Sequence, residues 1–344
     1  MQHSILRPGL LWLALLLAAP LSLAAQEVTE ALILGRREPK PQHFAYCRAD
    51  GGLITIANAS KNSSRYLAIY KYDAQFKRRW TAVLLERDGR TQVEQLAVLG
   101  RRILVFYSET TGRNEPARFF YDEYTLGGEQ VAQKRLMGTS RRPGKRDRYL
   151  NFQHSLDKQR LLAFEVLATE AEQEQLVYYA LSADTLGLQK GTVYFPYPDE
   201  PLRLTAVRMG NAGTVYALGK VRYDEKVKAP DDYQFVFFAY NPREDLITEA
   251  PIKIPELYVT DLLFKADPEE NCYIAGFYSK RSASDVRGLV SLRYDAAKKS
   301  LSVPAVVPFG QDFLGRYLND RQIRRGRELS DLYLDDMVLR SDGG

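Results

Sequence analysis

The stretch "AYCRADGGLITIANASKNSSRYLAIYKYD", residues 45–73, decides the fold. Its turn signal Asp50-Gly51-Gly52 is followed at once by the apolar run "LITIAN" (53–58). After a polar loop comes a third run, "YLAIYKYD" (66–73), which stops at Asp73. Short apolar runs rich in β-branched and aromatic residues, separated by Asp, Asn and Gly, predict antiparallel hairpins.

The same pattern recurs along the chain, which makes the stretch one unit of a repeat. Equivalent turn signals occur at Gly100-Arg101, Asp157-Lys158, Asn211-Ala212-Gly213 and Asp267-Pro268, at intervals of 50, 57, 54 and 56 residues. Each is followed by a second, third and fourth strand pattern, so each unit is predicted to be a four-stranded antiparallel meander. The units lie near 42–90, 91–146, 147–201, 202–255 and 256–308.

A meander of this size cannot bury both of its faces alone, so such units stack radially as blades. The sequence predicts an all-β fold, a β-propeller of about five four-stranded blades that forms a single domain over 26–344. The chain resembles β-propeller repeat proteins, most closely uncharacterised exported proteins of bacterial type. It lacks the Trp-Asp ending of WD40 repeats, the regular Gly-Gly of kelch repeats and the sialidase box. Two β-sandwiches remain the alternative.

The repeat is interrupted near its end. Residues 309–330 are predicted to be an insertion with a short helix near 312–325, begun by Asp312. Its apolar face would be made by Phe313, Leu314, Tyr317 and Leu318. Residues 331–344 then read as the inner strand of a sixth unit and its turn. The sequence is therefore expected to have been cut at Gly344, with "TEALILG" (29–35) available as an outer strand of the last blade.

The first 25 residues have the pattern of a signal peptide. Arg7 precedes the apolar run Leu10–Ala19, and small residues lead to a cleavage site near Ala25. A membrane-spanning helix needs roughly 20 apolar residues, so an uncleaved anchor is the weaker alternative. We expect export to the periplasm or the extracellular space, and no transmembrane segment.

Charge and cysteine content exclude several classes of protein. The formal net charge is only +5, which does not indicate a nucleic-acid partner. Two cysteines, Cys47 and Cys272, do not form a disulfide framework. They fall in units one and five, which are not neighbours in a ring of six or more units, so both are predicted to be free thiols.

No catalytic site can be assigned from the sequence. Beyond the signal segment the histidines are His43, expected to begin the first inner strand, and His154, expected just before a turn. Neither lies in a motif of a catalytic set or of a zinc site. Adjacent carboxylates are interpreted as structural or surface groups, because neighbours in a strand point to opposite faces: Asp199-Glu200, Asp231-Asp232, Glu269-Glu270 and Asp335-Asp336. We predict no cofactor and no metal.

Basic clusters offer the one recognisable surface signal. They occur at Lys77-Arg78-Arg79, at "RRPGKRDR" (141–148) and at Arg321, Arg324, Arg325 and Arg327. Such clusters usually belong to a solvated surface. The more specific interpretation is a binding site for an anion such as an acidic glycan, a lipid head group or an acidic partner.

The sequence thus favours a non-enzymatic binding or scaffold propeller that recognises a protein or a glycan on one face of the ring. The alternative is a glycan-cleaving hydrolase or lyase with carboxylates at the channel mouth. Two carboxylates from different inner strands would favour the enzyme, and an apolar channel would exclude it.

Overall fold

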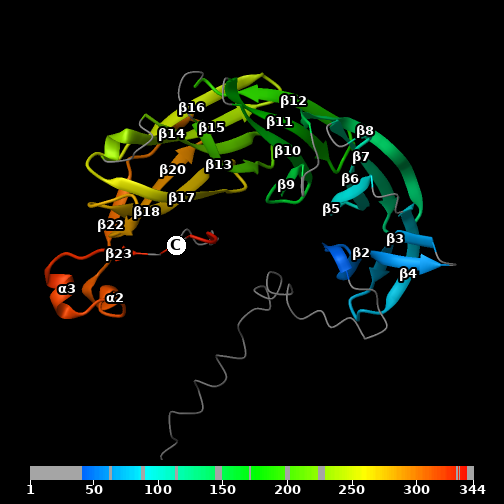
Figure 1. The fold of residues 1–344 in the computed structure, drawn as a ribbon, viewed down its shortest axis with the longest axis horizontal. Coiled ribbons are helices and arrows are strands. Elements are labelled where there is room, and N and C mark those ends of the chain that lie inside the picture. The colour runs from blue at the N-terminus through cyan, green and yellow to red at the C-terminus, as the bar shows by residue number, and fades with distance from the viewer. Residues whose placement is uncertain are drawn as a thin grey trace, which may run out of the picture.

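The computed structural model describes residues 41–61, 64–86, 90–112, 115–143, 149–169, 172–197, 202–223, 229–330, 332 and 334–338. Figure 1 shows five antiparallel sheets side by side in an open arc, with the first and last sheets at its two ends. We call each sheet a blade and number the blades from the N-terminus. This architecture confirms the predicted all-β propeller fold, and five separate sheets do not form two sandwiches.

Four strands in up-and-down order build each of the first four blades. Blade 1 contains β1 (Pro41–Cys47), β2 (Gly52–Lys61), β3 (Ser64–Tyr72) and β4 (Arg78–Glu86). Blade 2 contains β5 (Thr91–Leu99), β6 (Arg102–Glu109), β7 (Pro116–Thr125) and β8 (Gln130–Pro143). Blade 3 contains β9 (Asn151–His154), β10 (Arg160–Thr169), β11 (Glu172–Ser182) and β12 (Leu188–Tyr194). Blade 4 contains β13 (Leu202–Met209), β14 (Val215–Arg222), β15 (Tyr233–Asn241) and β16 (Leu246–Ile252).

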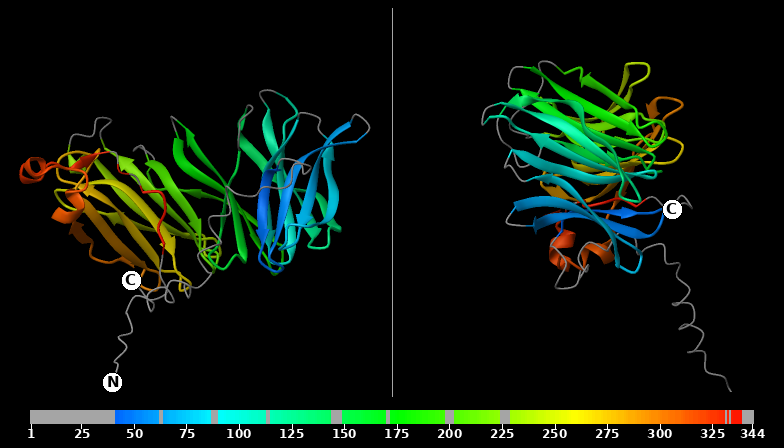
Figure 2. Two further views of the ribbon diagram at one scale, coloured as in Figure 1. Left: turned by 90° about the horizontal axis from the view of Figure 1, so that it is seen from below. Right: turned by 90° about the vertical axis from the view of Figure 1, so that its right-hand side faces the viewer.

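Blade 5 has a divided outer edge. Its strands are β17 (Tyr258–Ala266), β18 (Cys272–Ser279) and β20 (Gly288–Asp295), and the outer position is shared by β21 (Ser300–Leu301) and β22 (Ala305–Pro308). A separate two-stranded sheet pairs β19 (Asp285–Val286) with β23 (Leu329–Ser330). The first strand of every blade lies on the concave side of the arc (Figures 1 and 2), so β1, β5, β9, β13 and β17 are the inner strands.

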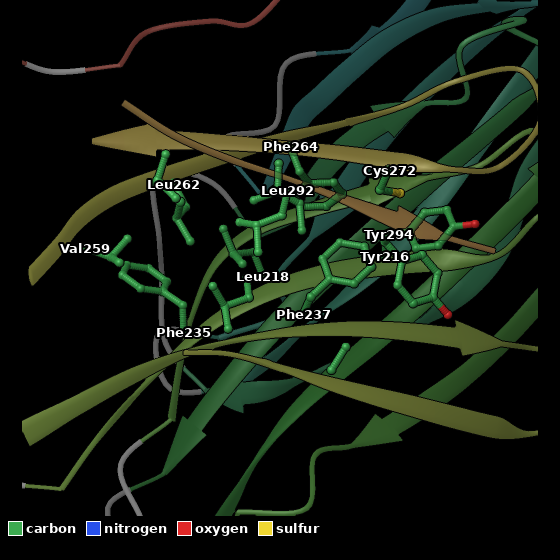
Figure 3. Packing of buried hydrophobic residues seen from close by; sticks show 14 of the residues in the cluster. Tyr216, Leu218, Phe235, Phe237, Val259, Leu262, Phe264, Cys272, Leu292 and Tyr294 are labelled. Carbon is green, nitrogen blue, oxygen red and sulfur yellow. The ribbon is translucent and has the colours of Figure 1, made fainter. Parts of the chain in front are cut away.

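The core lies between the blades. Figure 3 shows the layer between blades 4 and 5, where Phe237 of β15 meets Phe264 of β17 edge-on at 5.3 Å between ring centroids. Tyr294 of β20 packs on Phe237 at 4.9 Å. Because neighbouring blades cover both faces of blade 4, its middle strand β15 loses the alternation of half-buried strands, whereas β20 of the last blade keeps it. All residues of β15 except Asn241 are buried.

The two cysteines lie in different layers. Cys47 is buried between blades 1 and 2, and Cys272 is buried between blades 4 and 5. Both are free thiols, as the spacing of the units predicted.

The first hairpin of each blade shares a backbone conformation rather than a residue type. In each of these turns one residue has a positive φ: Gly51, Gly100, Lys158, Gly213 or Glu270. Glycine adopts this conformation at no steric cost, whereas other residues pay about 1–2 kcal/mol. The turns of blades 3 and 5 keep the geometry with Lys158 and Glu270, so the repeat has no periodic glycine.

The turn between β20 and β21 contains another such residue, Lys299, with φ of 52°. We expect Lys299→Gly to raise the free energy of unfolding by about 0.5–1 kcal/mol, because relief of the left-handed conformation exceeds the added entropy of the unfolded chain. Chemical denaturation measures the change. Lys298→Gly is the matched control and should lower stability, because Lys298 does not have a positive φ and pairs with Asp295 at 3.5 Å. Equal effects of the two substitutions would contradict the explanation.

The insertion forms two short helices rather than one. They are α2 (Gln311–Leu314) and α3 (Asp320–Arg324). The prediction that Asp312 caps the helix is wrong, because the N-cap of α2 is Gly310 and Asp312 lies in its first turn. Asn319 caps α3 through a capping box with Gln322.

The predicted apolar face of the insertion is only partly correct. Leu314 is buried in a cluster with Phe277, Val286 and Leu329, and Phe313 and Leu318 pack against it. Tyr317 is 60% exposed and lies beyond the end of α2, where it contacts Phe313 with 5.4 Å between ring centroids. The insertion therefore covers one end of blade 5.

After β23 the chain runs from blade 5 toward the inner side of the arc (Figure 1). Residues 334–338 form no strand, so the inner strand expected from a sixth unit is not formed over these residues. The remaining parts of that prediction, at 331, 333 and 339–344, lie outside the described residues, as do the signal segment 1–25 and the strand expected at 29–35.

Candidate functional site: a basic turn face

The first hairpins of the blades all lie at the same end of the inner strands, because each blade is an up-and-down meander and the inner strands run in the same direction. We call this end the turn face and define it by residues 48–51, 100–101, 155–159, 210–214 and 267–271. It contains the turn signals from which the repeat was recognised.

Hydrogen bonds join the turns of blades 3, 4 and 5. Asn211 accepts a bond from the Asp157 backbone N–H at 3.0 Å through its side chain and one from Arg160 Nε at 2.7 Å through its carbonyl. The Ala212 N–H donates to the Glu270 carboxylate at 2.9 Å. These residues are more than 50 positions apart, so the turns of blades 3, 4 and 5 form a connected surface rather than separate loops.

Four cations lie at this end of the inner strands. Arg48 follows β1, Lys158 lies in the turn after β9, and the other two are the penultimate residues of their strands: Arg208 in β13 and Lys265 in β17. We call these four residues the cation cluster. Burial lowers the pKa of Lys158, and the charges of Arg48 and Lys265 lower it further. Charges from blades 1, 3 and 5 therefore act on one ammonium group.

A carboxylate from the C-terminal segment contacts the cluster. Asp336 pairs with Lys265 Nζ at 2.9 Å. The hydrogen bond with Lys265 holds the pKa of Asp336 below its usual range, and the nearby charges of Lys265 and Arg208 act in the same direction. The cluster thus binds a carboxylate in this structure, and that carboxylate is half exposed.

His154 lies beside the cluster at the end of β9. Burial lowers the pKa of His154 to about 4, and the charges of Lys158 and Arg48 contribute. The imidazole is therefore neutral at physiological pH. Its Nδ1 is buried and has no hydrogen-bond partner in this structure. His43 lies in β1, the inner strand it was expected to begin.

A cavity of about 330 Å³ opens on the turn face between blades 3 and 4. Arg160 and Arg243 line it with Gln189 and Asn241, and no Asp or Glu is among its described lining residues. Gln189 of β12 donates to the carbonyl of Pro242 at 3.3 Å and so joins the two blades beside it. The cavity adds two guanidinium groups to the positive charge of the turn face.

The predicted carboxylate pairs have different roles. Glu270 connects the turns of blades 4 and 5, and Asp232 accepts a bond from the Ala229 N–H at 2.7 Å in the short helix η2 (Pro230–Asp232). Asp336 pairs with Lys265, whereas its neighbour Asp335 is exposed. The pair at 199–200 lies outside the described residues.

The predicted basic clusters are not the basic site that the fold assembles. Arg79 pairs with Asp73 of its own hairpin at 2.8 Å, and Arg141 donates to Gln175 and Thr192 of blade 3. Arg325 lies in the insertion after α3, and residues 144–148 are outside the described part of the chain.

Sequence reasoning missed the cation cluster because each of its members is isolated in the sequence. One signal was available: Arg208 and Lys265 occupy the same place in their units, since their partners Tyr216 and Tyr273 are equivalent in β14 and β18. Aligning the units by register would have shown two cations at one repeat position.

Two further features of the described residues bear on the site. No group of three or more His, Cys, Asp or Glu side chains among them could hold a metal ion. No helix over the same residues is long and apolar enough to cross a membrane.

Comparisons with known proteins find similar structures but no family. No protein-family model matches the chain, and no curated protein matches it. The polysaccharide lyase Uly1 matches with a TM-score of 0.45 and 10% identity over 81% of this chain and 76% of that one. The β-propeller domain of the Trilobed protease from Pyrococcus furiosus matches with a TM-score of 0.40 and 9% identity over 80% and 72%.

An endo-arabinase from Bacteroides thetaiotaomicron matches with a TM-score of 0.31 and 10% identity over 82% of this chain and 95% of that chain. Propeller domains and glycan-acting enzymes thus occur among the similar structures. The likeness is too low to extend beyond fold, and the type of propeller stays unassigned. The propeller architecture itself rests on the five sheets and their order.

Proposed function

We propose that this protein is an exported binding propeller whose turn face takes an anionic ligand, with an acidic glycan bearing uronate carboxylates as the favoured class. The observation that carries the proposal is the cation cluster, built from four single residues of blades 1, 3, 4 and 5. Export is part of the proposal and rests on the signal-peptide pattern of residues 1–25.

The electrostatics of the cluster supports an anionic ligand. Bringing like charges together is unfavourable, and an anion that binds among them offsets this cost. Carboxylates also make charge-assisted hydrogen bonds with lysine and arginine. The guanidinium groups of Arg160 and Arg243 at the cavity extend the positive surface beyond the cluster. A polymer with repeated carboxylates fits such a surface better than a single small anion.

Calorimetry with polygalacturonate oligomers tests this proposal. We expect the double variant Lys158→Gln/Lys265→Gln to bind at least about tenfold more weakly than the wild type, because two charges in the cluster are lost. The matched control is Lys298→Gln/Lys299→Gln, which removes the same charge from the exposed hairpin of blade 5 and should bind like the wild type. Binding should weaken with salt, as expected for exposed charges. Equal loss in both double variants, or equal binding of neutral arabinan, would overturn the proposal.

The second candidate is a glycan-cleaving enzyme, specifically a lyase. The cation cluster favours it over a hydrolase, because cations around a uronate carboxylate make the neighbouring C5 proton more acidic, and eliminative cleavage begins with loss of that proton. Prolonged incubation with polygalacturonate distinguishes the two candidates, with ultraviolet absorbance as the measure of unsaturated uronate product. Formation of this product would identify a lyase. Binding without product would identify a binding protein.

A further inference from the structure

The C-terminal segment, of which residues 332 and 334–338 are described, contacts blade 5 at two places. Leu332 and Leu334 pack against the apolar cluster formed by Phe277, Leu314 and Leu329. Two residues after Leu334, Asp336 reaches Lys265 of the inner strand β17 at 2.9 Å. The insertion of α2 and α3 thus anchors the segment 334–338, which runs toward the concave side of the arc (Figure 1).

Local geometry orients the carboxylate. The backbone N–H of Met337 donates to Asp336 Oδ1 at 2.8 Å, and the same oxygen pairs with Lys265. The charge of Arg208 also acts on this carboxylate. Asp335, one residue earlier, is exposed and has no such ion pair with the cluster. Of these two adjacent acids, therefore, it is Asp336 that neutralises part of the cation cluster.

We propose that the segment 334–338 is a built-in competitor for the anion site, in which Asp336 stands where a ligand carboxylate would pair with Lys265 and Arg208. This inference rests on the proposed function, because it describes regulation of the same site. A tethered group has a high effective concentration and lowers the apparent affinity of a free competitor. The segment must leave Lys265 before a ligand carboxylate takes that position.

The solvent exposure of the Lys265–Asp336 ion pair limits how strongly Asp336 can compete with a ligand. The side chains of Lys265 and Asp336 are 33% and 51% exposed, and pairs of this kind are weak in water. Removing the carboxylate should therefore tighten ligand binding by about twofold to fivefold. A weak, displaceable contact is what a competitor requires, since a strong one would close the site permanently.

The test compares Asp336→Asn with Asp335→Asn in the full chain, by calorimetry with polygalacturonate oligomers. We expect Asp336→Asn to tighten binding about twofold to fivefold and Asp335→Asn to leave it unchanged, although both remove one negative charge. In a Lys265→Gln background the effect of Asp336→Asn should become smaller, because the ion pair with Lys265 no longer exists and only the charge of Arg208 still acts on Asp336. Melting temperatures of both variants separate competition from a structural role, which would lower stability and weaken binding.

The outcomes also separate this inference from the proposed function. If the wild type binds and Asp336→Asn binds no more tightly, or if both variants tighten binding equally, the competitor role is wrong and the anion site stands. If neither the wild type nor any variant binds the oligomers, the proposed function fails and the competitor role fails with it.

Discussion

Gly276→Ala is expected to lower the free energy of unfolding by about 3 kcal/mol, the upper end of the range for overpacked interiors. Gly276 lies in β18 opposite Leu262 of the inner strand β17, next to a register shift between Val259 and Asp261. A methyl group on Gly276 would overlap the carbonyl oxygen of Asp261 and the side chain of Leu262. Since one obstacle is backbone, relief requires displacement of the inner strand. Guanidinium denaturation of both proteins measures the effect.

Gly127→Ala is the matched control for this prediction. Gly127 lies in the exposed turn between β7 and β8, and an added methyl group would meet only Thr125 Oγ1, at an ordinary 3.5 Å. Its stability should change by less than about 0.5 kcal/mol. The explanation would be wrong if Gly276→Ala were as mild as Gly127→Ala.

Glu94→Ala should have an effect of similar size, about 3 kcal/mol, for a different reason. The Glu94 side chain is 1% exposed and accepts bonds from Ser108 Oγ at 2.7 Å and from the backbone N–H of Tyr149 at 3.1 Å. Ser108 belongs to blade 2, whereas Tyr149 precedes blade 3. The substitution removes an acceptor from two buried donors and weakens a connection between blades.

Two further variants make the Glu94 prediction specific. Glu94→Gln keeps one acceptor oxygen and should lose less stability than Glu94→Ala. Gln95→Ala changes the neighbouring half-buried side chain and should cost less than about 1 kcal/mol. Thermal unfolding followed by circular dichroism ranks the three. The same loss in Gln95→Ala and Glu94→Ala would show that any truncation in β5 has this effect.

Glu94 also belongs to a structural repeat, a β-bulge in the inner strand, that cannot be recognised from the sequence. It is the extra residue at a register shift in β5, and Thr205 and Thr260 hold the equivalent places in β13 and β17. The Thr205 hydroxyl donates to the carbonyl of Leu218 at 3.1 Å, and that of Thr260 donates to the carbonyl of Phe277 at 3.4 Å. Glu94 and the two threonines thus secure a bulge at the same place in blades 2, 4 and 5, so the geometry repeats although the residue type is not constant.

The strands and their order could be predicted from the sequence because they depend on local chemistry. An apolar run such as "FVFFAY" must be buried on both faces, and Asp, Asn and Gly end it in a turn. The separation of the two cysteines followed from the same repeat. The helical insertion expected near 312–325 is confirmed, but it contains two short helices rather than one, because Asn319 starts a second helix with its own capping box.

The candidate site could not be predicted in the same way. Arg48, Lys158, Arg208 and Lys265 are separated by at least 50 positions and stand alone in their units, so none differs from an ordinary surface cation. The clusters that were conspicuous in sequence are local runs, such as Lys77-Arg78-Arg79, and lie elsewhere.

By itself, then, the sequence determined the meanders, their number in the described part of the chain and the free thiols, since these depend on burial patterns and turn residues within one unit. Only the tertiary structure decided where charge accumulates and which acid meets it. Stacking the blades places one cation from each of several units on the turn face. It also brings Asp336 into an ion pair with Lys265, 71 positions away in the sequence. Charge interactions act through space, so their sum is set by the arrangement of the blades rather than by the neighbours of any one residue.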